Sequence, residues 1–380
     1  YRQVKTAAEN ALNFAAEQRG ISREELADQI VPDLGFDERM GRDFDYGERK
    51  FRVMLTPALE IEVFDGKGKK LKNLPAPSKK DDEKRAGTAY EEFKQMKKQM
   101  KEIVASQKLR LEQALSSARC WSIPAWRQLF VKNPIMHQFA IGLIWGVYKD
   151  GRLVQSFRYM EDGSFNTQDE EEYLLPAKIN PDGNQQGKES PENNEKAEQE
   201  KFIQEKIRKI GLVHPVELSE QDVKAWRQQL EDYEIVQPFL QLERPVFTPE
   251  EEELSQRKLS RFSGRVINDM SLGSRLMGAG WYHGPVLDGG CFRTYYREDK
   301  EIGFGVELHF SGCFIGYLNE DVTVEDVRFY KLEDIDADGL FYGGDIKKAY
   351  QIKDIPAKYF SEIALQVERA TAQAQGISGK

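Results

Sequence analysis

The chain is poor in cysteine and histidine, and it has no apolar run long enough to cross a membrane. A membrane helix needs about 20 mostly apolar residues. The longest candidate, residues 135–148, is interrupted by His137, Gln138 and two glycines. Three scattered cysteines among 380 residues argue against a disulfide framework, and four histidines stand at no metal-ligand spacing. These absences predict a cytoplasmic protein without a metal site or a cofactor.

Signatures of known reactions are also missing. No P-loop or dinucleotide-binding glycine motif stands between a strand and a helix, and no serine lies in a nucleophile elbow. Asp334, Asp336 and Asp338 alternate like a calcium loop, but the twelfth position falls on Asp345 instead of the required glutamate. The sequence specifies no reaction, which favours a non-catalytic protein.

The negative charge is concentrated in one segment. The formal net charge is -9, and residues 161–200 alone hold 12 acidic side chains against three lysines. The rest of the chain is therefore close to neutral and has no basic footprint for nucleic acid. The part of this segment around 180–205 is also rich in Asn, Gln, Gly and Pro, so we expect a mobile acidic insertion.

The first 45 residues predict a pair of helices. Apolar residues recur at helical spacing over 3–18, and Ser22 followed by Glu25 is a capping box for a second helix ending near residue 30. The chain starts within the helical pattern and without an initiator Met, so we expect these helices to be the tail of an upstream repeat array.

Residues 46–270 predict an α+β body. Alternating apolar residues over 51–63 predict a β-hairpin, and a stripe of apolar residues over 82–118 predicts a long helix with lysines 94–101 on its outer face. Two short helices over 121–139 follow, and then a hairpin over 141–159 that turns at Asp150-Gly151. Strand and helix are expected to alternate from about 200 to Arg261.

Residues 271–380 predict a β-rich subdomain. Segments 292–296, 302–309, 314–318 and 324–330 are predicted as four strands of an antiparallel sheet separated by Gly-rich turns. A closing helix is predicted over 356–375, with a proline at its first turn and Gly376 after its end. The fold class is therefore α+β with three segments, 1–45, 46–270 and 271–380.

The most informative stretch for a site runs from residue 211 to residue 245. His214 follows a predicted strand, and the segment after the next helix mixes polar side chains with aliphatic residues of the buried type. Buried polar groups need partners, so this stretch is the polar seam of a core or the wall of a binding site. The candidate ligand-binding residues are His214, Tyr233, Glu234, Gln237, Gln241 and Arg244, with Trp145 nearby.

Arg244 decides between these two interpretations. Its guanidinium could clamp a carboxylate or a phosphate of a ligand with two hydrogen bonds. It could equally neutralise Glu234 inside a packed seam. The sequence leaves both open.

Three blocks of residues carry a resemblance to a known family. They lie at 26–53, 110–163 and 214–244, and they contain the segments IVPDLGFD at 30–37, DYGERKF at 45–51, RCW at 119–121, LIWGVY at 143–148 and EDG at 161–163. In order and spacing they resemble the bacterial "domain of unknown function 4132" family, which includes MolR-like proteins of the "molybdate metabolism regulator" type. The resemblance covers about residues 20–270, and the acidic insertion at 180–205 is longer than in relatives.

The resemblance implies neighbouring domains and partner proteins for this chain, but no reaction. Such proteins tend to be large and cytoplasmic, and this region follows helical repeats of the HEAT type and sometimes a WGR domain. They are often encoded beside MoxR-type ATPases and von Willebrand A-type proteins. The family implies no catalytic residues for this chain.

Three hypotheses for function follow. The first is a non-catalytic adaptor whose partners are proteins: the upstream repeats, a MoxR-type ATPase and von Willebrand A-type proteins. The second is an enzyme or a nucleotide- or anion-binding domain with a pocket near 233–244. The third is binding of nucleic acid by the lysines at 94–101, which the overall charge disfavours.

Overall fold

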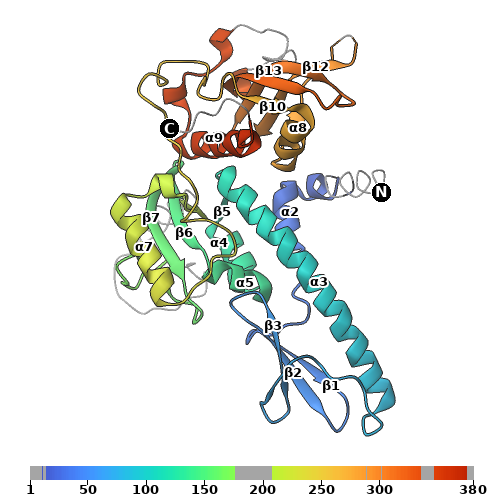
Figure 1. Cartoon of the computed structure of the whole chain (residues 1–380). Coiled ribbons are helices and arrows are strands. Elements are labelled where there is room, and N and C mark those ends of the chain that lie inside the picture. The colour runs from blue at the N-terminus through green and yellow to red at the C-terminus, as the bar shows by residue number, and fades with distance from the viewer. Residues whose placement is uncertain are drawn as a thin grey trace, which may run out of the picture. The chain divides into compact units, whose positions relative to one another are not determined.

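The structure, a computed structural model, describes residue 11 and residues 14–175, 208–287, 289–300, 302–334 and 346–374 (Figure 1). The fold is α+β, with three antiparallel sheets among the described residues. The predicted acidic insertion at 180–205 and the acidic loop from 336 to 345 lie outside the described residues, as does most of the predicted helix over 3–18. No helix in the described ranges is long and apolar enough to cross a membrane.

The chain forms two compact units. The first comprises Tyr1–Glu112, Cys120–Val213 and Lys224–Gln241, and the second comprises Gln113–Arg119, His214–Val223 and Leu242–Lys380. The three-segment division from the sequence stays a prediction.

The first sheet confirms the predicted hairpin over 51–63. Phe51, Val53 and Leu55 alternate on its buried side, as expected for a sheet with one covered face. Its four strands pair in sequence order: β1 (Gly41–Asp45), β2 (Lys50–Leu55), β3 (Ile61–Asp65) and β4 (Lys70–Leu71).

The long helix α3 (Glu83–Ser116) is also confirmed. Its buried stripe contains Phe93, Met96, Met100, Leu111 and Leu115. The short helix α2 (Arg23–Gln29) starts at the predicted capping box of Ser22 and Glu25. Within the first unit, Asp28 at the end of α2 accepts hydrogen bonds from Arg110 at 2.7 Å and from Trp121 at 2.8 Å.

The second sheet contains the predicted Asp-Gly hairpin, formed by β6 (Ile144–Lys149) and β7 (Arg152–Tyr159). The strand order is β5 (Cys120–Ser122), β9 (Arg208–Leu212), β6, β7 and β8 (Phe165–Asn166). The helical segments beside it in the chain are α4 (Ile123–Trp126), the π-helix η1 (Arg127–Val131), α5 (Pro134–Ile141) and α7 (Glu220–Asp232). Helix α7 is tied to β7 because Trp226 Nε1 donates to Ser156 Oγ at 3.1 Å.

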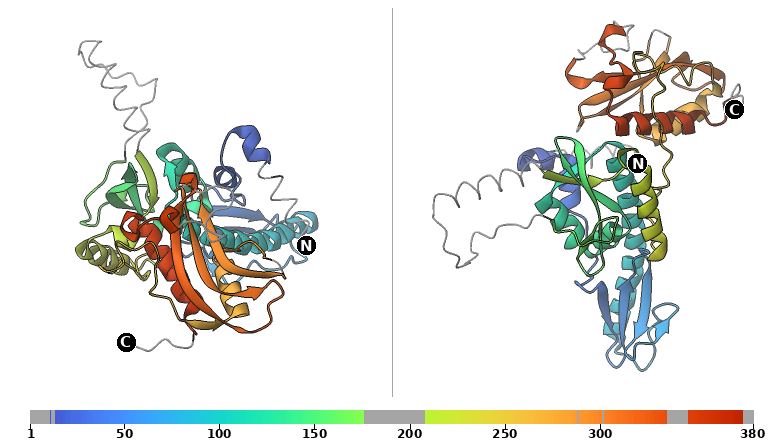
Figure 2. Two further views of the ribbon diagram at one scale, coloured as in Figure 1. Left: turned by 90° about the horizontal axis from the view of Figure 1, so that it is seen from above. Right: turned by 90° about the vertical axis from the view of Figure 1, so that its left-hand side faces the viewer.

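The second unit is built on an antiparallel sheet with the order β10 (Val266–Asn268), β14 (Asp321–Lys331), β13 (Phe304–Phe314), β12 (Cys291–Asp299) and β11 (Tyr282–His283). Helices α8 (Asp269–Gly278) and α9 (Ala357–Thr371) belong to this unit, and α9 lies along one face of the sheet (Figure 2). The short 3-10 helices are η2 (Pro215–Glu217), η3 (Leu332–Asp334), η4 (Ile346–Lys348) and η5 (Ile352–Asp354).

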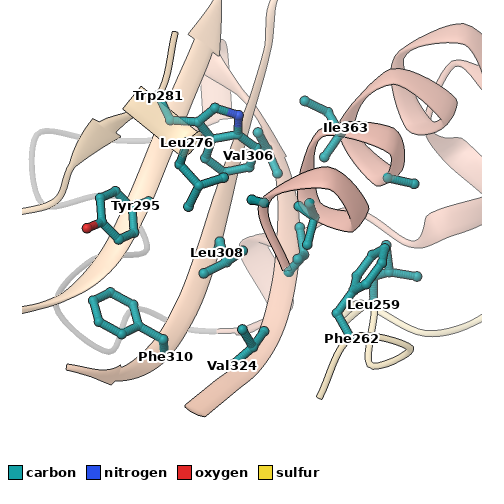
Figure 3. Close-up of a cluster of buried hydrophobic side chains, with 14 of the residues drawn as sticks. Leu259, Phe262, Leu276, Trp281, Tyr295, Val306, Leu308, Phe310, Val324 and Ile363 are labelled. Atoms are coloured by element: carbon teal, nitrogen blue, oxygen red, sulfur yellow. The ribbon is translucent and has the colours of Figure 1, made fainter. Parts of the chain in front are cut away.

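Helix and sheet of the second unit share one apolar core (Figure 3). Val306 and Leu308 of β13 are fully buried together with Ile363 of α9 and Trp281. The closing helix is thus confirmed, with Pro356 as its N-cap. Position 305 of β13 requires glycine, because a Cβ there would stand 2.3 Å from the ring of Tyr330.

Three predictions of secondary structure were wrong. The predicted strand 314–318 is absent, because β13 ends at Phe314 and the chain turns through Tyr317 and Asn319 at φ of 49° and 60°. The alternation predicted up to Arg261 stops earlier, since residues 233–265, all of them described, contain no helix or strand. Ile141 closes α5 instead of opening a strand. In each case local hydrophobicity did not specify the backbone conformation, and in 314–318 it did not mark burial either, since Phe314, Ile315 and Leu318 are exposed.

Candidate functional site

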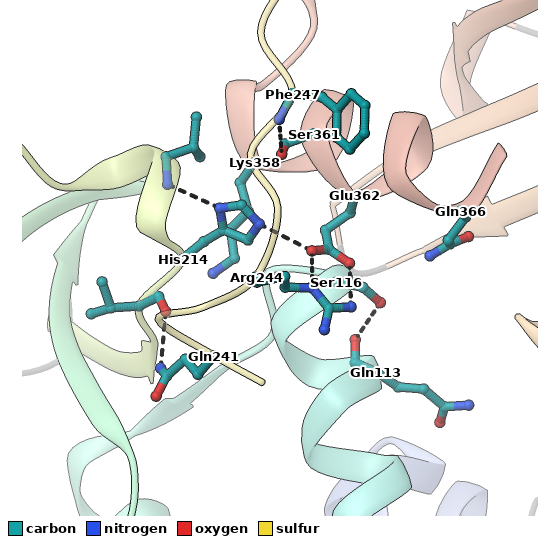
Figure 4. A network of polar contacts seen from close by, with 12 residues as sticks. Gln113, Ser116, His214, Gln241, Arg244, Phe247, Lys358, Ser361, Glu362 and Gln366 are labelled. Atoms are coloured by element: carbon teal, nitrogen blue, oxygen red, sulfur yellow. Dashed lines mark hydrogen bonds and ion pairs between the residues drawn. The ribbon is translucent and has the colours of Figure 1, made fainter. Parts of the chain in front are cut away.

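The structure brings two of the seven candidate residues into one buried network (Figure 4). His214 and Arg244, both in the second unit, meet at the carboxylate of Glu362 on α9. His214 Nε2 lies 3.0 Å from Glu362 Oε1, and Arg244 Nη2 donates to Glu362 Oε2 at 2.9 Å. Arg244 Nε also donates to Glu362 Oε1. The Arg244–Glu362 pair is therefore bidentate and buried.

The orientation of the His214 ring is fixed by its own backbone. His214 is the N-cap of η2, and its Nδ1 accepts the Val216 N–H at 3.1 Å. A nitrogen that accepts has no proton, so Nε2 carries the hydrogen and donates it to Glu362. Glu217 completes a capping box by accepting the His214 N–H at 2.9 Å.

Glu362 is held as a carboxylate. Burial alone would raise its pKa, but hydrogen bonds from His214 and Arg244 outweigh burial and lower the pKa to about 2. A buried ionised acid with these donors is a poor proton acceptor at neutral pH. The chemistry that the geometry supports here is ion pairing, and a ligand would have to displace Glu362 to reach the same edge of Arg244.

The partner of Arg244 is a correction to the sequence analysis. The seam interpretation paired Arg244 with Glu234, ten residues away in the sequence, whereas the structure pairs it with Glu362, 118 residues away. Glu234 is exposed and adopts a left-handed backbone with φ of 52°.

Gln237 and Gln241, both in the first unit, lie together and serve the backbone. Gln241 is fully buried, and its Oε1 accepts from the Ile144 N–H and from Gln237 Nε2, both at 2.9 Å. Its Nε2 donates to the carbonyls of Ile144 at 2.7 Å and Val213 at 2.9 Å. The Gln241 amide thus satisfies buried backbone groups at the ends of β6 and β9.

Trp145 lies in the aromatic core of the first unit. It is fully buried, and its Nε1 donates to the Ala140 carbonyl at 3.0 Å. Its ring centroid lies 4.6 Å from that of Phe130 and 5.3 Å from that of Trp126. These contacts of Trp145 all lie within the first unit. A ligand-binding role for these seven residues stays a prediction.

Tyr233 has a different neighbour, Arg158 of β7. The Arg158 guanidinium carbon lies over the Tyr233 ring, 4.3 Å from its centre, in a cation–π contact. Arg158 is 1% exposed, whereas Tyr233 is 47% exposed. Burial lowers the pKa of Arg158, although Tyr233 and Glu170 act in the opposite direction.

Other polar features are exposed. An open depression of about 680 Å³ in the first unit is lined by Asp37, Glu38, Arg39, Asp43, Arg52 and Met54. Arg52 fills part of it by pairing with Asp37 at 2.5 Å and with Asp43 at 2.8 Å, and the hydrogen bond from Arg52 lowers the pKa of Asp37. Among the described residues, no group of three or more His, Cys, Asp or Glu side chains could hold a metal ion.

The lysines predicted as a nucleic-acid ridge lie on the outer face of α3. Lys94 pairs with Glu91 at 2.8 Å, and its ammonium nitrogen lies 4.5 Å from the centre of the Tyr90 ring. Lys97, Lys98 and Lys101 are exposed. Nucleic-acid binding stays a prediction.

Sequence analysis missed Glu362 and Arg158. Glu362 lies on the buried face of α9, one position before the core residue Ile363, so a charged residue within an apolar helical stripe was the available signal. Arg158 stands between the buried aromatic residues Phe157 and Tyr159 of β7. A charge at a strand position that faces a helix is the corresponding signal there.

Several half-exposed apolar side chains of the second unit belong to α8 and to the segment 314–318, and Tyr317 links the two. Tyr317 Oη lies 3.6 Å from Met277 Sδ of α8, and the Tyr317 N–H donates to the Phe314 carbonyl at 2.9 Å. We call the half-exposed residues here the α8 patch. It consists of Met270, Met277, Phe314, Ile315 and Leu318, which are 43–55% exposed.

These features define an α+β protein in which the polar cluster of His214, Arg244 and Glu362 is buried. Comparison with family models then identifies the group. The chain belongs to the family described as "Domain of unknown function (DUF4132)", whose model matches residues 68–281.

A curated relative supports this assignment. The chain is 31% identical over 267 residues to "Uncharacterized protein YehI" of Escherichia coli (strain K12). The match covers 70% of this chain and 20% of that relative, so the chain spans about a fifth of the relative's length. No solved structure matches the chain.

Proposed function

We propose that this chain is a non-catalytic interaction module of a larger cytoplasmic, MolR-like protein. Its partners are proteins: upstream helical repeats, a MoxR-type ATPase and von Willebrand A-type proteins. The resemblance of the three sequence blocks supplies these partners. The small share of YehI that the chain covers agrees with a module of a longer protein.

The α8 patch is the observation that carries the proposal. Exposed apolar patches mark protein-interaction sites more often than scattered single apolar residues do. Methionine and aromatic residues are also enriched in the centres of such interfaces. Met270 and Met277 lie seven residues apart, on one face of α8.

The polar side chains at 214–244 support the same conclusion, because other groups of the chain already bind Arg244 and Gln241. Glu362 occupies the bidentate edge of Arg244, and backbone groups occupy the amide of Gln241. Recognition by outer surfaces is therefore favoured over recognition by this segment. The alternative, an enzyme or a nucleotide- or anion-binding domain near 233–244, requires Arg244 to leave Glu362.

The test is complex formation with purified partners. We expect the chain to co-elute with the MoxR-type ATPase or the von Willebrand A-type protein on size-exclusion chromatography at micromolar concentration. The double variant Met270→Glu/Met277→Glu should lose the complex, because charge at the centre of an apolar interface is not solvated.

Leu174→Glu is the matched control, since Leu174 is an apolar residue of the first unit that is 79% exposed. It should retain the complex. Independent elution of the unmodified chain and both neighbours would refute the adaptor function. Equal loss of the complex in the double variant and in Leu174→Glu would show that the α8 patch is not the binding surface.

A further inference from the structure

Arg158 is a buried cation without a hydrogen-bond partner. Its Nε, Nη1 and Nη2 are all shielded from solvent, and none has a partner among the described residues. Arginine stays protonated in proteins, so a charge lies inside the first unit without a counter-ion bonded to it. Burying a charge is costly unless it is paired and hydrogen-bonded.

Two other buried arginines, Arg244 and Arg297, are paired within the chain. Arg244 binds Glu362, and Arg297 binds Asp299 with Nη2 at 2.7 Å from Oδ1. In both pairs the guanidinium group is hydrogen-bonded to a carboxylate. Arg158 has the same burial and lacks the carboxylate.

The ring of Tyr233 does not replace a partner. The contact is a cation–π contact, and it leaves Nε, Nη1 and Nη2 of Arg158 without a hydrogen-bond acceptor. A cation–π contact is also weaker than the desolvation penalty of an unpaired ion. The edge of Arg158 therefore still lacks acceptors.

The Tyr233 side chain is placed by a helix ending. Ile235 N–H donates to the Leu230 carbonyl at 2.8 Å and Glu234 N–H to the Glu231 carbonyl at 3.0 Å, which together form a Schellman motif. Tyr233 is the C-cap in this motif. Its backbone is held while its half-exposed ring lies over Arg158, so the ring can rotate without unwinding α7.

Further buried polar atoms near this place in the fold lack partners. Gln229 lies one turn before Tyr233 on α7, and its Nε2 donates to the Thr167 and Gln168 carbonyls at 2.9 and 3.2 Å. The Oε1 atoms of Gln229 and Gln168 are buried and have no donor among the described residues. In the strand pairing, Arg158 is opposite Asn166, two residues before Gln168.

We propose that Arg158 and Tyr233 form a binding site for an oxyanion, a carboxylate or phosphate group, with the Tyr233 ring as its movable cover. The Nε and Nη2 edge of Arg158 offers the two parallel donors that such groups accept. A ligand that also carries an O–H or N–H would serve the Gln229 and Gln168 oxygens. This site is independent of the adaptor function.

Anion-dependent stability tests the site. The unmodified chain is heated with increasing sodium phosphate or sodium acetate, with sodium chloride holding the ionic strength constant. We expect a saturable rise in the unfolding midpoint, about 5 °C at a hundredfold excess over Kd. The stronger of the two anions identifies the ligand as a phosphate or a carboxylate.

Variants assign the effect to Arg158. Arg158→Met should abolish the saturable rise, and Arg158→Lys should weaken binding about tenfold or more because the fork is lost. Tyr233→Ala should retain saturable binding, since it removes the cover and leaves the donors. The proposal is overturned if neither anion gives a saturable rise in the unmodified chain. An equal rise in Arg158→Met would indicate an adventitious ion only and would overturn it too.

A second measurement, made in chloride alone, does not depend on a ligand. Arg158→Met should raise the unfolding midpoint by about 2–4 °C, because it removes a charge that has no partner. Arg297→Met is the control, and it should lower the midpoint because Asp299 loses its partner. A fall in both variants would show that Arg158 is satisfied within the fold and would overturn the site. Arg158→Met should also retain the ATPase complex, so a failure of the anion site can be told apart from a failure of the adaptor proposal.

Discussion

The Arg244 network of the second unit and the Arg158–Tyr233 pair of the first unit treat a buried arginine in opposite ways. Arg244 meets Glu362 from a distant helix, and a histidine with a fixed tautomer shares the same carboxylate. Arg158 meets an aromatic face and no carboxylate. The difference teaches that burial alone does not distinguish a structural charge from a charge that is available to a ligand. The hydrogen-bond partners of each charge distinguish the two cases.

The largest expected effect is that of Arg244→Ala. It leaves Glu362 buried without its main counter-charge, so we expect a loss of about 3–5 kcal/mol in the free energy of unfolding. Urea denaturation measures it. Arg52→Ala is the control, because Arg52 pairs with Asp37 and Asp43 at an exposed position and should cost no more than about 1 kcal/mol. If Arg244→Ala folds with full stability, Arg244 belongs to a ligand site instead.

Acid should weaken the same network. The folded-state pKa of Glu362 is lowered from 4.5 to about 2, so its contribution is present above pH 4.5 and is lost as the pH falls from 4.5 towards 2. The size is on the order of 3 kcal/mol. Unfolding free energies measured between pH 6 and pH 2 should show this slope, and Glu362→Gln should remove it. An identical slope in Glu362→Gln would assign the acid sensitivity to other carboxylates.

Gln241→Leu probes a buried polar group of the first unit that, unlike Arg158, is satisfied. It leaves the Ile144 N–H and the Ile144 and Val213 carbonyls without the side-chain amide. We expect a loss of about 1–3 kcal/mol, measured by urea denaturation. Gln228→Leu on the exposed face of α7 is the control and should change stability by less than about 0.5 kcal/mol.

The smallest effect concerns the ending of α7 beside Arg158. Glu234 adopts φ of 52°, a conformation that glycine takes without strain. Glu234→Gly should therefore stabilise the chain by about 0.5–1 kcal/mol and leave the Tyr233 ring over Arg158. Thermal unfolding measures the gain. A loss of stability would show that the Glu234 side chain contributes more than its backbone costs.

Much of the local structure could be predicted from the sequence. The capping box at Ser22, the stripe of α3 and the hairpin at Asp150-Gly151 depend on residues close together in the chain, and all three were confirmed. The segment 314–318 misled because its apolar residues form a turn with exposed side chains. Apolar composition indicates a strand only where a neighbouring strand is free to pair with it.

The candidate site shows the same limit more sharply. Sequence analysis identified His214 and Arg244 as polar residues that need partners, and it offered Glu234 because Glu234 is near in the sequence. The actual partner, Glu362, lies 118 residues from Arg244. Nothing in the spacing of one chain reports such a contact.

The sequence by itself determined the α+β class, the main helices and hairpins, and the need of its buried polar residues for partners, because periodicity and caps act over a few residues. Only the tertiary structure decided which partner each buried charge received. Glu362 reached Arg244 and no carboxylate reached Arg158, because ion pairing at this distance depends on how remote elements pack.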